Sequence, residues 1–585
     1  MRTSRLWIFA ALAALSVLSQ KFLGVTSLLG IYGDDACYLL EARRIIDGNI
    51  CADCGLVVPP TGYARGWPLF LSLFVPLLGG DWDAYRWITI AVTAASVVLS
   101  FDLASRRFGA KVAALLATAV ALSPVVLEFG HTAMSEPFYL FLVLVAVRLE
   151  LAGVKPAVAV GQGLVAGLAA STRPEGVLLG AALLFHGLFA KRWKALGMMV
   201  LVATATVATV NWLSPNNSPY NSALVEYFQG IGSPGSFLFS QVMNRSLLLG
   251  RALLTLSAFW DRSLALVLVG AFLFHLYKVR ALKLEHWMIL GTTAVLLVWP
   301  YLSERYWLPV LPLILIIVLE TVPRDKYRGF LLAFLIFGQL LTARTHPNQE
   351  PERVIAARQT LLRALAKTGP NEVVATPTPG YIHVWGHRST HVLRGASSIG
   401  LMAVEMERQK ANLVLAEKVE TLIWSATGRQ YSFPSHFPLW LERCSLFETV
   451  YAGEGGVLAR LKTPAERLEI AFEGWQAGAQ SSDPSVRLGH FEKALKAVPD
   501  FPELRVLWTM TALEKGGALV PVASAKALEY LRQYPHDFEG GAAMIAALWQ
   551  AGAQDQARQA AELCYREAQR LKDSAASRFA SLVSP

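Results

Sequence analysis

The sequence predicts a mainly α-helical polytopic membrane protein that ends in a soluble half. Of its 585 residues, 54% are hydrophobic and 16% are charged, and the mean hydropathy is +0.41. This composition is too apolar for a soluble protein of such length. Apolar stretches long enough to cross a bilayer recur as far as residue 342, and the rest of the chain is more polar. A membrane domain followed by soluble domains is therefore expected.

About eleven transmembrane helices are expected from the apolar stretches. These stretches lie near residues 6–23, 84–104, 110–128, 133–151, 157–172, 174–190, 195–213, 263–277, 287–303, 306–322 and 328–342. The transmembrane domain should cover 1–344, with external loops at 24–83 and 214–262. The shorter run 67–78 fits an interfacial or re-entrant helix. An uncleaved first helix is favoured over a signal peptide, because no clear small-x-small cleavage site follows Leu18.

The basic residues predict the orientation of this domain. Lys and Arg concentrate in the turns on the side of the N-terminus, as in Arg106, Arg107 and Lys111, whereas the opposite loops are longer and less basic. By the positive-inside rule the N-terminus is cytoplasmic, and everything after about residue 343 is extracytoplasmic. The net charge of +10 is then mostly a topology signal and predicts no nucleic-acid partner. A bacterial inner membrane is the default location.

An acidic pair follows the first apolar segment. Asp34 and Asp35 should emerge at the far membrane surface. Two adjacent carboxylates at a membrane face are unfavourable unless they are solvated, paired or functional, so the pair is a candidate site. The alternative is a solvated acidic loop.

Further polar residues are predicted at the same surface. Tyr38 and Arg65 belong to the first external loop, Glu136 begins a helix, and Arg173 and Arg305 lie in external turns. The Lys and Arg residues of the turns on the cytoplasmic side are interpreted as membrane anchors only. Guanidinium groups hold an anionic phosphate leaving group, and a carboxylate orients or deprotonates an attacking hydroxyl. This combination favours group transfer from a lipid-linked phosphate donor.

Four motifs in order carry a resemblance to a known superfamily. They are Asp34-Asp35-Ala-Cys-Tyr38, Gly66-Trp67-Pro68-Leu69, Thr172-Arg173-Pro174-Glu175-Gly176 and Arg305-Tyr306-x-x-Pro309-x-x-Pro312. With them, residues 5–345 resemble the C-type (GT-C) membrane glycosyltransferases, the superfamily of protein O-mannosyltransferases and the lipid A aminoarabinose transferase. The resemblance implies an inverting glycosyltransferase that moves a sugar from a polyprenyl-phosphate donor to an acceptor hydroxyl on the extracytoplasmic face.

The same resemblance implies roles for the motif residues. Asp34 would be the catalytic base or acceptor-orienting carboxylate, with Asp35 as its support or a metal contact. Arg173 and Arg305 would bind the donor phosphate. The resemblance implies no definite cofactor, and dependence on a divalent metal ion is an open alternative.

Three more residues are candidates for acceptor binding or support. Glu136 is either a second acid near the acceptor or an ordinary helix N-terminal acid after Ser135. Tyr38 belongs to the acidic motif. Arg65 is a candidate contact of the phosphate or the acceptor.

Cysteine and histidine patterns add two minor hypotheses. A disulfide between Cys51 and Cys54 is the leading interpretation of the Cys-Ala-Asp-Cys stretch, on the oxidising side of the membrane. A zinc site that also used Cys37 would need a fourth ligand. The spacing of His383, His387 and His391 would suit a metal site on a helix, but this stretch is β-rich, which disfavours the site.

The soluble half divides into two predicted parts. Residues 345–462 alternate helical and short apolar stretches, which is typical of a small extracytoplasmic α/β domain. The expected helices are Glu352–Lys367 and Leu401–Asn412, and the expected strands are Glu372–Thr376, Tyr381–Trp385, Thr421–Trp424 and Val457–Leu461. Residues 463–585 are helical with a repeat of about 34–36 residues and resemble tetratricopeptide repeats. They would recruit an acceptor or envelope partner; a plain helical bundle is the alternative.

Two other functions are compatible with a polytopic chain. A transporter or lipid flippase is the first alternative, and it would place charged or Gly/Pro-broken positions at mid-membrane depth. A membrane-anchored scaffold, with the repeats as its working part, is the second. The expected partners are a polyprenyl-phosphate-linked sugar, membrane lipid and a protein, lipid or glycan acceptor, and the sequence does not distinguish between these acceptors.

Overall fold

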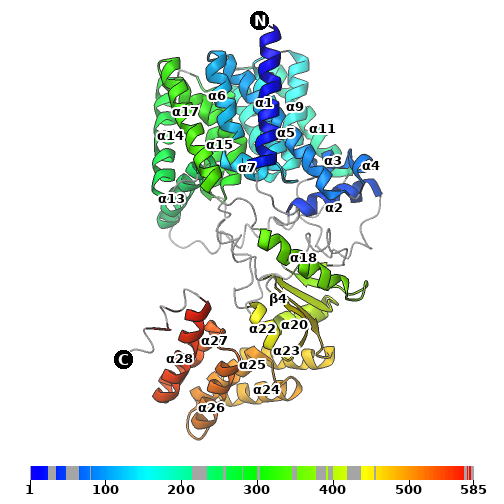
Figure 1. The fold of residues 1–585 in the computed structure, drawn as a ribbon, viewed down its shortest axis with the longest axis vertical. Helices are drawn as coiled ribbons and strands as arrows, with labels where there is room; N and C mark the ends of the chain where they lie inside the picture. Colours follow the sequence, from blue (N-terminus) through cyan, green and yellow to red (C-terminus); the bar gives the residue numbers. More distant parts are fainter. Residues whose placement is uncertain are drawn as a thin grey trace. The chain divides into compact units, whose positions relative to one another are not determined.

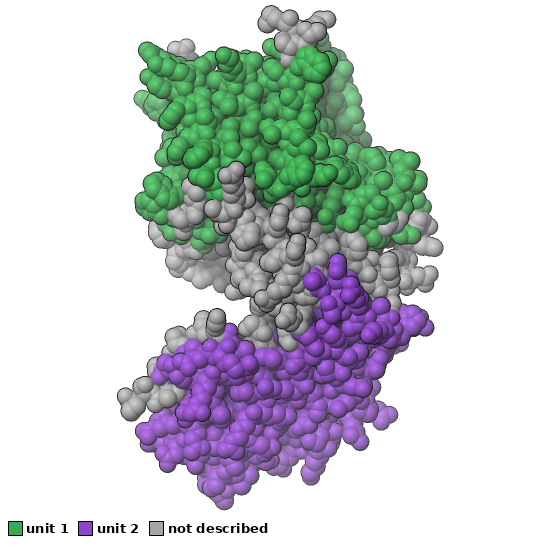
Figure 2. Space-filling model, in the orientation of Figure 1, with its two compact units in different colours: residues 1–52, 59–352 green, residues 53–58, 353–585 purple. Residues whose placement is uncertain are grey.

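The structure is a computed structural model that divides into two compact units. Unit 1 contains residues 1–52 and 59–352, and unit 2 contains residues 53–58 and 353–585 (Figure 2). The described residues are 2–23, 34–47, 65–79, 81–153, 155–213, 234–254, 258–279, 281–298, 303–345, 352–376, 390–392, 399–417, 437–453, 456–571, 576 and 579–580.

Unit 1 is helical throughout its described part (Figure 1). Its α-helices are α1 (Arg2–Leu23), α2 (Asp34–Asp47), α3 (Gly66–Ser72), α4 (Val75–Leu78), α5 (Tyr85–Ser105), α6 (Ala110–Ala121), α7 (Pro124–Phe129), α8 (Glu136–Glu150), α9 (Pro156–Thr172), α10 (Val177–Phe189), α11 (Trp193–Leu213), α13 (Pro234–Leu253), α14 (Ala258–Lys278), α15 (Leu284–Val298), α16 (Leu311–Thr321) and α17 (Asp325–Thr345). Three 3-10 helices join them, η1 (Trp82–Ala84), η2 (Pro174–Gly176) and η3 (Glu304–Val310).

The apolar segments of the sequence correspond to helices of unit 1. Each of the eleven predicted spans is helical over most of its length. Among the described residues, four helices are long and apolar enough to cross a membrane, within Arg5–Leu23, Trp82–Ser105, Trp193–Trp212 and Phe259–Lys278. Four shorter apolar helices accompany them. The chain is thus a mainly α-helical integral membrane protein, and the number of eleven spans stays a prediction.

Proline residues mark helix starts in two of the predicted spans and divide one of them. The segment 110–128 is not one helix, because α6 ends at Ala121 and α7 begins at Pro124. A proline in a helix interior removes a backbone donor and clashes with the preceding turn, whereas the first turn accepts it. Pro174 has the same position in η2, directly before α10.

One long helix of unit 1 falls within the predicted external loop 214–262. Helix α13 packs against α14, α15 and η3. Its sequence mixes apolar residues with buried polar ones such as Gln241 and Arg245. That mixture lowers its hydropathy below that of a membrane span, and hydropathy alone therefore does not detect the helix.

Unit 2 begins with helix α18 (Glu352–Ala366) and contains a five-stranded mixed sheet of order β2-β1-β3-β5-β4. The strands are β1 (Val374–Thr376), β2 (Thr390–Val392), β3 (Leu413–Glu417), β4 (Phe447–Gly453) and β5 (Gly456–Leu461). β1 pairs in parallel with β2 and β3, and β5 pairs antiparallel with β3 and β4. Helices α20 (Ile399–Arg408) and α22 (Phe437–Arg443) accompany the sheet. The predicted strands at 381–385 and 421–424 lie outside the described residues.

Six helices complete unit 2. They are α23 (Ala465–Gln480), α24 (Pro484–Ala497), α25 (Pro502–Lys515), α26 (Leu519–Gln533), α27 (Phe538–Gln550) and α28 (Gln554–Leu571). Consecutive helices pack on one another, α25 also packs on α27, and α26 packs on α28. This arrangement agrees with stacked helix pairs, and their assignment as tetratricopeptide repeats stays a prediction.

The sheet and the six helices share one hydrophobic core. Buried Val414 of β3 and Met402 of α20 belong to the same cluster as Phe501 before α25. Burying a side chain such as Phe501 contributes about 1.5–3 kcal/mol. In addition, the Glu503 carboxylate accepts the backbone N–H of Gly400 at 3.1 Å. The helices therefore cover an apolar face of the α/β layer.

The turn between α9 and α10 has no room for a side chain at Gly176. A Cβ atom there would lie 1.8 Å from the carbonyl oxygen of Ala169. Such an overlap is with backbone and cannot be relieved by a change of rotamer. Close approach of this turn to α9 therefore requires glycine.

We expect Gly176→Ala to destabilise unit 1 by about 1–3 kcal/mol or more, because the added methyl group must push the turn away from α9. Thermal unfolding in detergent micelles measures the effect. Gly180→Ala is the matched control, since a Cβ at Gly180 in α10 meets no atom within 4 Å. Equal unfolding midpoints for the two variants would contradict the prediction.

Candidate active site

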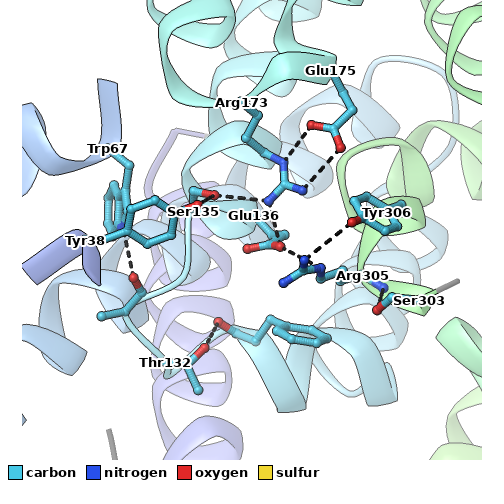
Figure 3. Close-up of polar contacts among 12 residues, drawn as sticks. Tyr38, Trp67, Thr132, Ser135, Glu136, Arg173, Glu175, Ser303, Arg305 and Tyr306 are labelled. Carbon is cyan, nitrogen blue, oxygen red and sulfur yellow. Dashed lines mark hydrogen bonds and ion pairs between the residues drawn. The ribbon is translucent and has the colours of Figure 1, made fainter. Parts of the chain in front are cut away.

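Four segments that are far apart in the sequence meet at one end of unit 1. They are the N-terminal parts of α2 and α8, the turn that follows α9, and η3 (Figure 3). Helix α8 begins at Glu136 with Pro137 in its first turn. The helix ends thereby bring Tyr38, Glu136, Arg173 and Arg305 together, as the one-sided placement of these residues predicted.

Arg173 is the most connected side chain of the site. Its Nη1 lies 2.6 Å from Oε1 of Glu136 and donates to Ser135 Oγ at 3.0 Å. Its Nε lies 3.2 Å from Oε2 of Glu175. Burial disfavours the charged guanidinium, but attraction to Glu136 and Glu175 outweighs this effect, so the pKa of Arg173 lies well above its ordinary value. Arg173 therefore stays cationic although it is buried.

Arg305 approaches the same carboxylate from η3. Its Nε lies 3.3 Å from Oε1 of Glu136. The carboxylate of Glu136 is therefore placed between two guanidinium groups, and Glu136 is completely buried. In η3, the backbone N–H of Arg305 donates to the side chain of Ser303 at 3.4 Å.

An aromatic ring joins the two arginines. The Arg173 guanidinium lies 5.6 Å from the centroid of the Tyr306 ring, and that of Arg305 lies 5.2 Å from it. Arg305 Nη2 also donates to Tyr306 Oη at 3.4 Å. Cation–π attraction holds both guanidinium groups beside the same aromatic ring, although their like charges repel each other.

A small pocket opens beside these groups. Its polar lining includes Arg173, Arg305 and Tyr306. Its apolar lining comes from Leu178 of α10 and from Val295 and Leu296 of α15, among others. A ligand with an anionic head and an apolar body would match both parts of the lining.

A hydrogen-bonded link connects the acidic helix to Arg173. Tyr38 Oη and Ser135 Oγ lie 3.2 Å apart. Ser135 Oγ accepts from Arg173 Nη1, and either hydroxyl group can be the donor between Ser135 and Tyr38. Helix α2 is thereby coupled to the arginine pair through one hydroxyl group.

The acidic pair lies at the start of α2. Asp34 is the first residue of this helix, and its side chain lies outside the described residues. Asp35 is buried, and its Oδ1 accepts the backbone N–H of Ala36 at 3.0 Å. Arg65 is buried directly before α3, a helix that packs against α2 and α9. Trp67 of α3 donates to the Ala133 carbonyl at 2.8 Å.

Other sequence-based candidates are less well defined. Cys51 and Cys54 lie outside the described residues, as do His383 and His387. No group of three or more His, Cys, Asp or Glu that could hold a metal ion occurs in the described part of the chain. A metal contact at Asp35 stays a prediction.

The sequence analysis did not assign roles to Ser135, Glu175 or Tyr139. Tyr139 Oη donates to the backbone carbonyl of Glu175 at 3.0 Å and thereby holds the turn after α9 against α8. Glu175 is itself part of the quoted turn motif, and Ser135 directly precedes the candidate Glu136. A search for polar residues adjacent to each candidate would have found Ser135.

The opposite ends of these helices carry more than anchoring cations. Arg107 pairs with Glu285 and, at 3.0 Å, with Glu320. Glu150, at the other end of α8 from Glu136, pairs with Arg192 and accepts from Gln162 at 2.9 Å. The interpretation of these turns as simple membrane anchors was therefore incomplete, because their acidic partners come from distant segments.

Comparison with known proteins agrees with the sequence analysis. Residues 68–300 match the model of Glycosyltransferase family 87. This match confirms the prediction of a glycosyltransferase. No curated protein matches the chain.

Two solved structures also match the chain. One is ArnT from Cupriavidus metallidurans bound to undecaprenyl phosphate, with 12% identity and a TM-score of 0.48. The other is the apo state of the same protein, with 13% identity and a TM-score of 0.38. Each covers 78% of this chain and 98% of the ArnT chain.

We expect Ser135→Ala to lower glycosyl transfer about tenfold, because a hydrogen bond to a charged group is lost and α2 is uncoupled from Arg173. Transfer rates of purified protein in lipid measure this effect. Ser100→Ala is the matched control, since Ser100 is equally buried and donates to the Ser96 carbonyl within α5. Equal loss in both variants would assign the effect to general destabilisation.

Proposed function

We propose that the protein transfers a sugar from a polyprenyl-phosphate donor to an acceptor hydroxyl at the extracytoplasmic face of the membrane, with inversion at the anomeric carbon. The observation that carries the proposal is the convergence of Arg173 and Arg305 beside a pocket with an apolar wall. The match to a glycosyltransferase family supports the reaction class. The four motifs on α2, α3, the α9–α10 turn and η3 support the donor class.

The arginine pair suits a phosphate leaving group. Guanidinium groups donate several hydrogen bonds in a fixed plane and remain charged when they are buried. As the bond between C1 of the sugar and the phosphate oxygen breaks, negative charge grows on the phosphate. Two preorganised cations stabilise that charge without reorganisation, which lowers the barrier of the transfer.

The acidic end of α2 suits activation of the acceptor. In the proposed reaction a carboxylate takes the proton of the acceptor hydroxyl while its oxygen forms the new bond to C1. Asp34 is the proposed base, with Asp35 as its support. The Tyr38–Ser135–Arg173 link supports a common site for base and phosphate, because it connects α2 with the arginines. Arg65 and Tyr38 are proposed as supports of the acceptor.

We expect Asp34→Asn to abolish most donor turnover, by about 10²–10⁴-fold, because the base is lost while the side-chain shape is kept. Purified protein in lipid is offered a panel of polyprenyl-phosphate sugars, and sugar release and transfer are measured. Asp35→Asn is tested in parallel.

Turnover unchanged in Asp34→Asn would move the base to Asp35 or Glu136. If folded wild-type protein turns over no donor of the panel, the proposed donor class is wrong. A transporter or lipid flippase then becomes the better hypothesis, and uptake or lipid scrambling in the same vesicles would test it.

We further propose that the helices 463–585 act as repeats that recruit a protein acceptor or a cell-envelope partner. The stacked helix pairs support this role, since such arrays usually offer an extended binding surface. Exposed apolar residues on them are Ile470, Val486 and Val522, at 40%, 47% and 49% exposure. Removing all six helices would strip the sheet of its cover, so surface substitutions are the sharper test.

We expect the full-length variant with Ile470, Val486 and Val522 changed to Glu to lose affinity for its acceptor, because charges would replace apolar contacts. The KM for the acceptor should rise, while the KM for the donor stays unchanged. Gln476→Glu adds a charge at an exposed polar position of α23 and serves as the control. An unaltered acceptor KM in the triple variant would contradict recruitment by these residues.

A further inference from the structure

Glu136 occupies the space that a phosphate held by both arginines would need. Its Oε1 lies 2.6 Å from Arg173 Nη1 and 3.3 Å from Arg305 Nε. The side chain is completely buried and lies between the two guanidinium groups (Figure 3). A phosphate oxygen that bridges the arginines would compete for the same donors.

The four charged groups of the site already balance one another. Arg173 and Arg305 contribute two positive charges, and Glu136 and Glu175 contribute two negative charges. A donor phosphodiester would add one negative charge, and the released polyprenyl phosphate would add one or two. Buried charge without a partner is strongly unfavourable. Phosphate binding therefore requires one of the carboxylates to give up its contacts.

The contacts distinguish the two carboxylates. Glu175 lies two residues after Arg173 and contacts its Nε and Nη2, at 3.2 and 3.5 Å. Glu136 instead contacts both arginines through one oxygen atom. A phosphate oxygen that bridges Arg173 Nη1 and Arg305 Nε needs the position of Glu136 Oε1, whereas Glu175 contacts other atoms of Arg173 and can stay in place.

The structure assigns Glu136 the role of an internal competitor of the donor phosphate. It is a positioning residue that contacts both arginines when no donor is bound. It loses these contacts when the donor binds and forms them again as the polyprenyl phosphate leaves. It thereby weakens donor binding and accelerates product release. This inference rests on the proposed function, since it takes a polyprenyl phosphate as the ligand.

The test is the affinity of full-length protein in detergent for undecaprenyl phosphate, measured by microscale thermophoresis, together with donor turnover. Glu136→Gln removes the competing charge and keeps the size of the side chain, so the dissociation constant should fall about tenfold. Both the donor KM and kcat should fall, because product release slows. Glu136→Asp keeps the charge, which favours folding, but its shorter side chain cannot span both arginines as well. It should bind the lipid phosphate about threefold more tightly than wild type.

Glu304→Gln is the matched control, because it removes a neighbouring negative charge from η3 at a residue that is not buried. The affinity of this variant for the lipid phosphate should stay within about twofold of wild type, as expected for a charge that is only partly buried. Unchanged or weaker binding by both Glu136 variants, with normal donor turnover by wild type, would overturn the inference and leave the proposed function intact. Absence of both binding and turnover in folded wild type would overturn the proposed function, and the inference with it.

Discussion

The contact of Glu136 with Arg173 and Arg305 is the constraint on which the described site depends. Three charged side chains are buried there, and none of them would be stable without the others. Glu136 is at the start of α8, Arg173 follows α9, and Arg305 is in η3, so compensation of charge is possible only if these helix ends meet. The ion pairs thus fix the relative positions of segments that are up to 169 residues apart.

Local sequence determines where the helix ends lie. Pro137 and Pro174 each stand in the first turn of a helix, where the ring imposes a favourable φ and the missing N–H is not needed. Gly176 then allows the turn to approach the backbone of α9. As a result, the side chains of Glu136 and Arg173 lie close enough to form an ion pair. Tyr306 adds a rigid surface on which both guanidinium groups rest.

Much of this arrangement is predictable from sequence because it depends on hydropathy and on one-sided placement of charge. The apolar segments predict the helices of unit 1, and the external polar residues predict that Tyr38, Glu136, Arg173 and Arg305 share an end. Contacts between residues that are far apart in the sequence are harder to predict. Neither the bridge from Ser135 to Tyr38 nor the ion pair of Arg107 with Glu320 follows from a local pattern, since each depends on tertiary packing.

Short and mixed-polarity elements were the other source of error. Helix α13 has buried polar residues and no long apolar run, so it was assigned to a loop. Strand β3 was also missed, and the helix preceding it was expected to continue to Asn412, whereas α20 ends at Arg408 and Lys410 adopts a positive φ of 55°. Strand β2 has three residues, too few for an alternation to be recognised. In each case tertiary contacts outweighed the local pattern.

The two ends of the helices differ in a way that bears on function. At one end Glu136 lies between Arg173 and Arg305. At the other end Arg107 lies between Glu285 and Glu320, and Asp102 lies between Arg106 and Arg148. An anion that displaces the acid at the first end finds two guanidinium groups already oriented for it. At Arg107 an anion would meet two carboxylates, and Coulomb repulsion would oppose its binding. The arginine pair at the first end differs in another respect, because Arg173 and Arg305 line a pocket together with apolar side chains of α10 and α15. A ligand with an anionic group and an apolar chain would therefore fit better at the first end than beside Arg107.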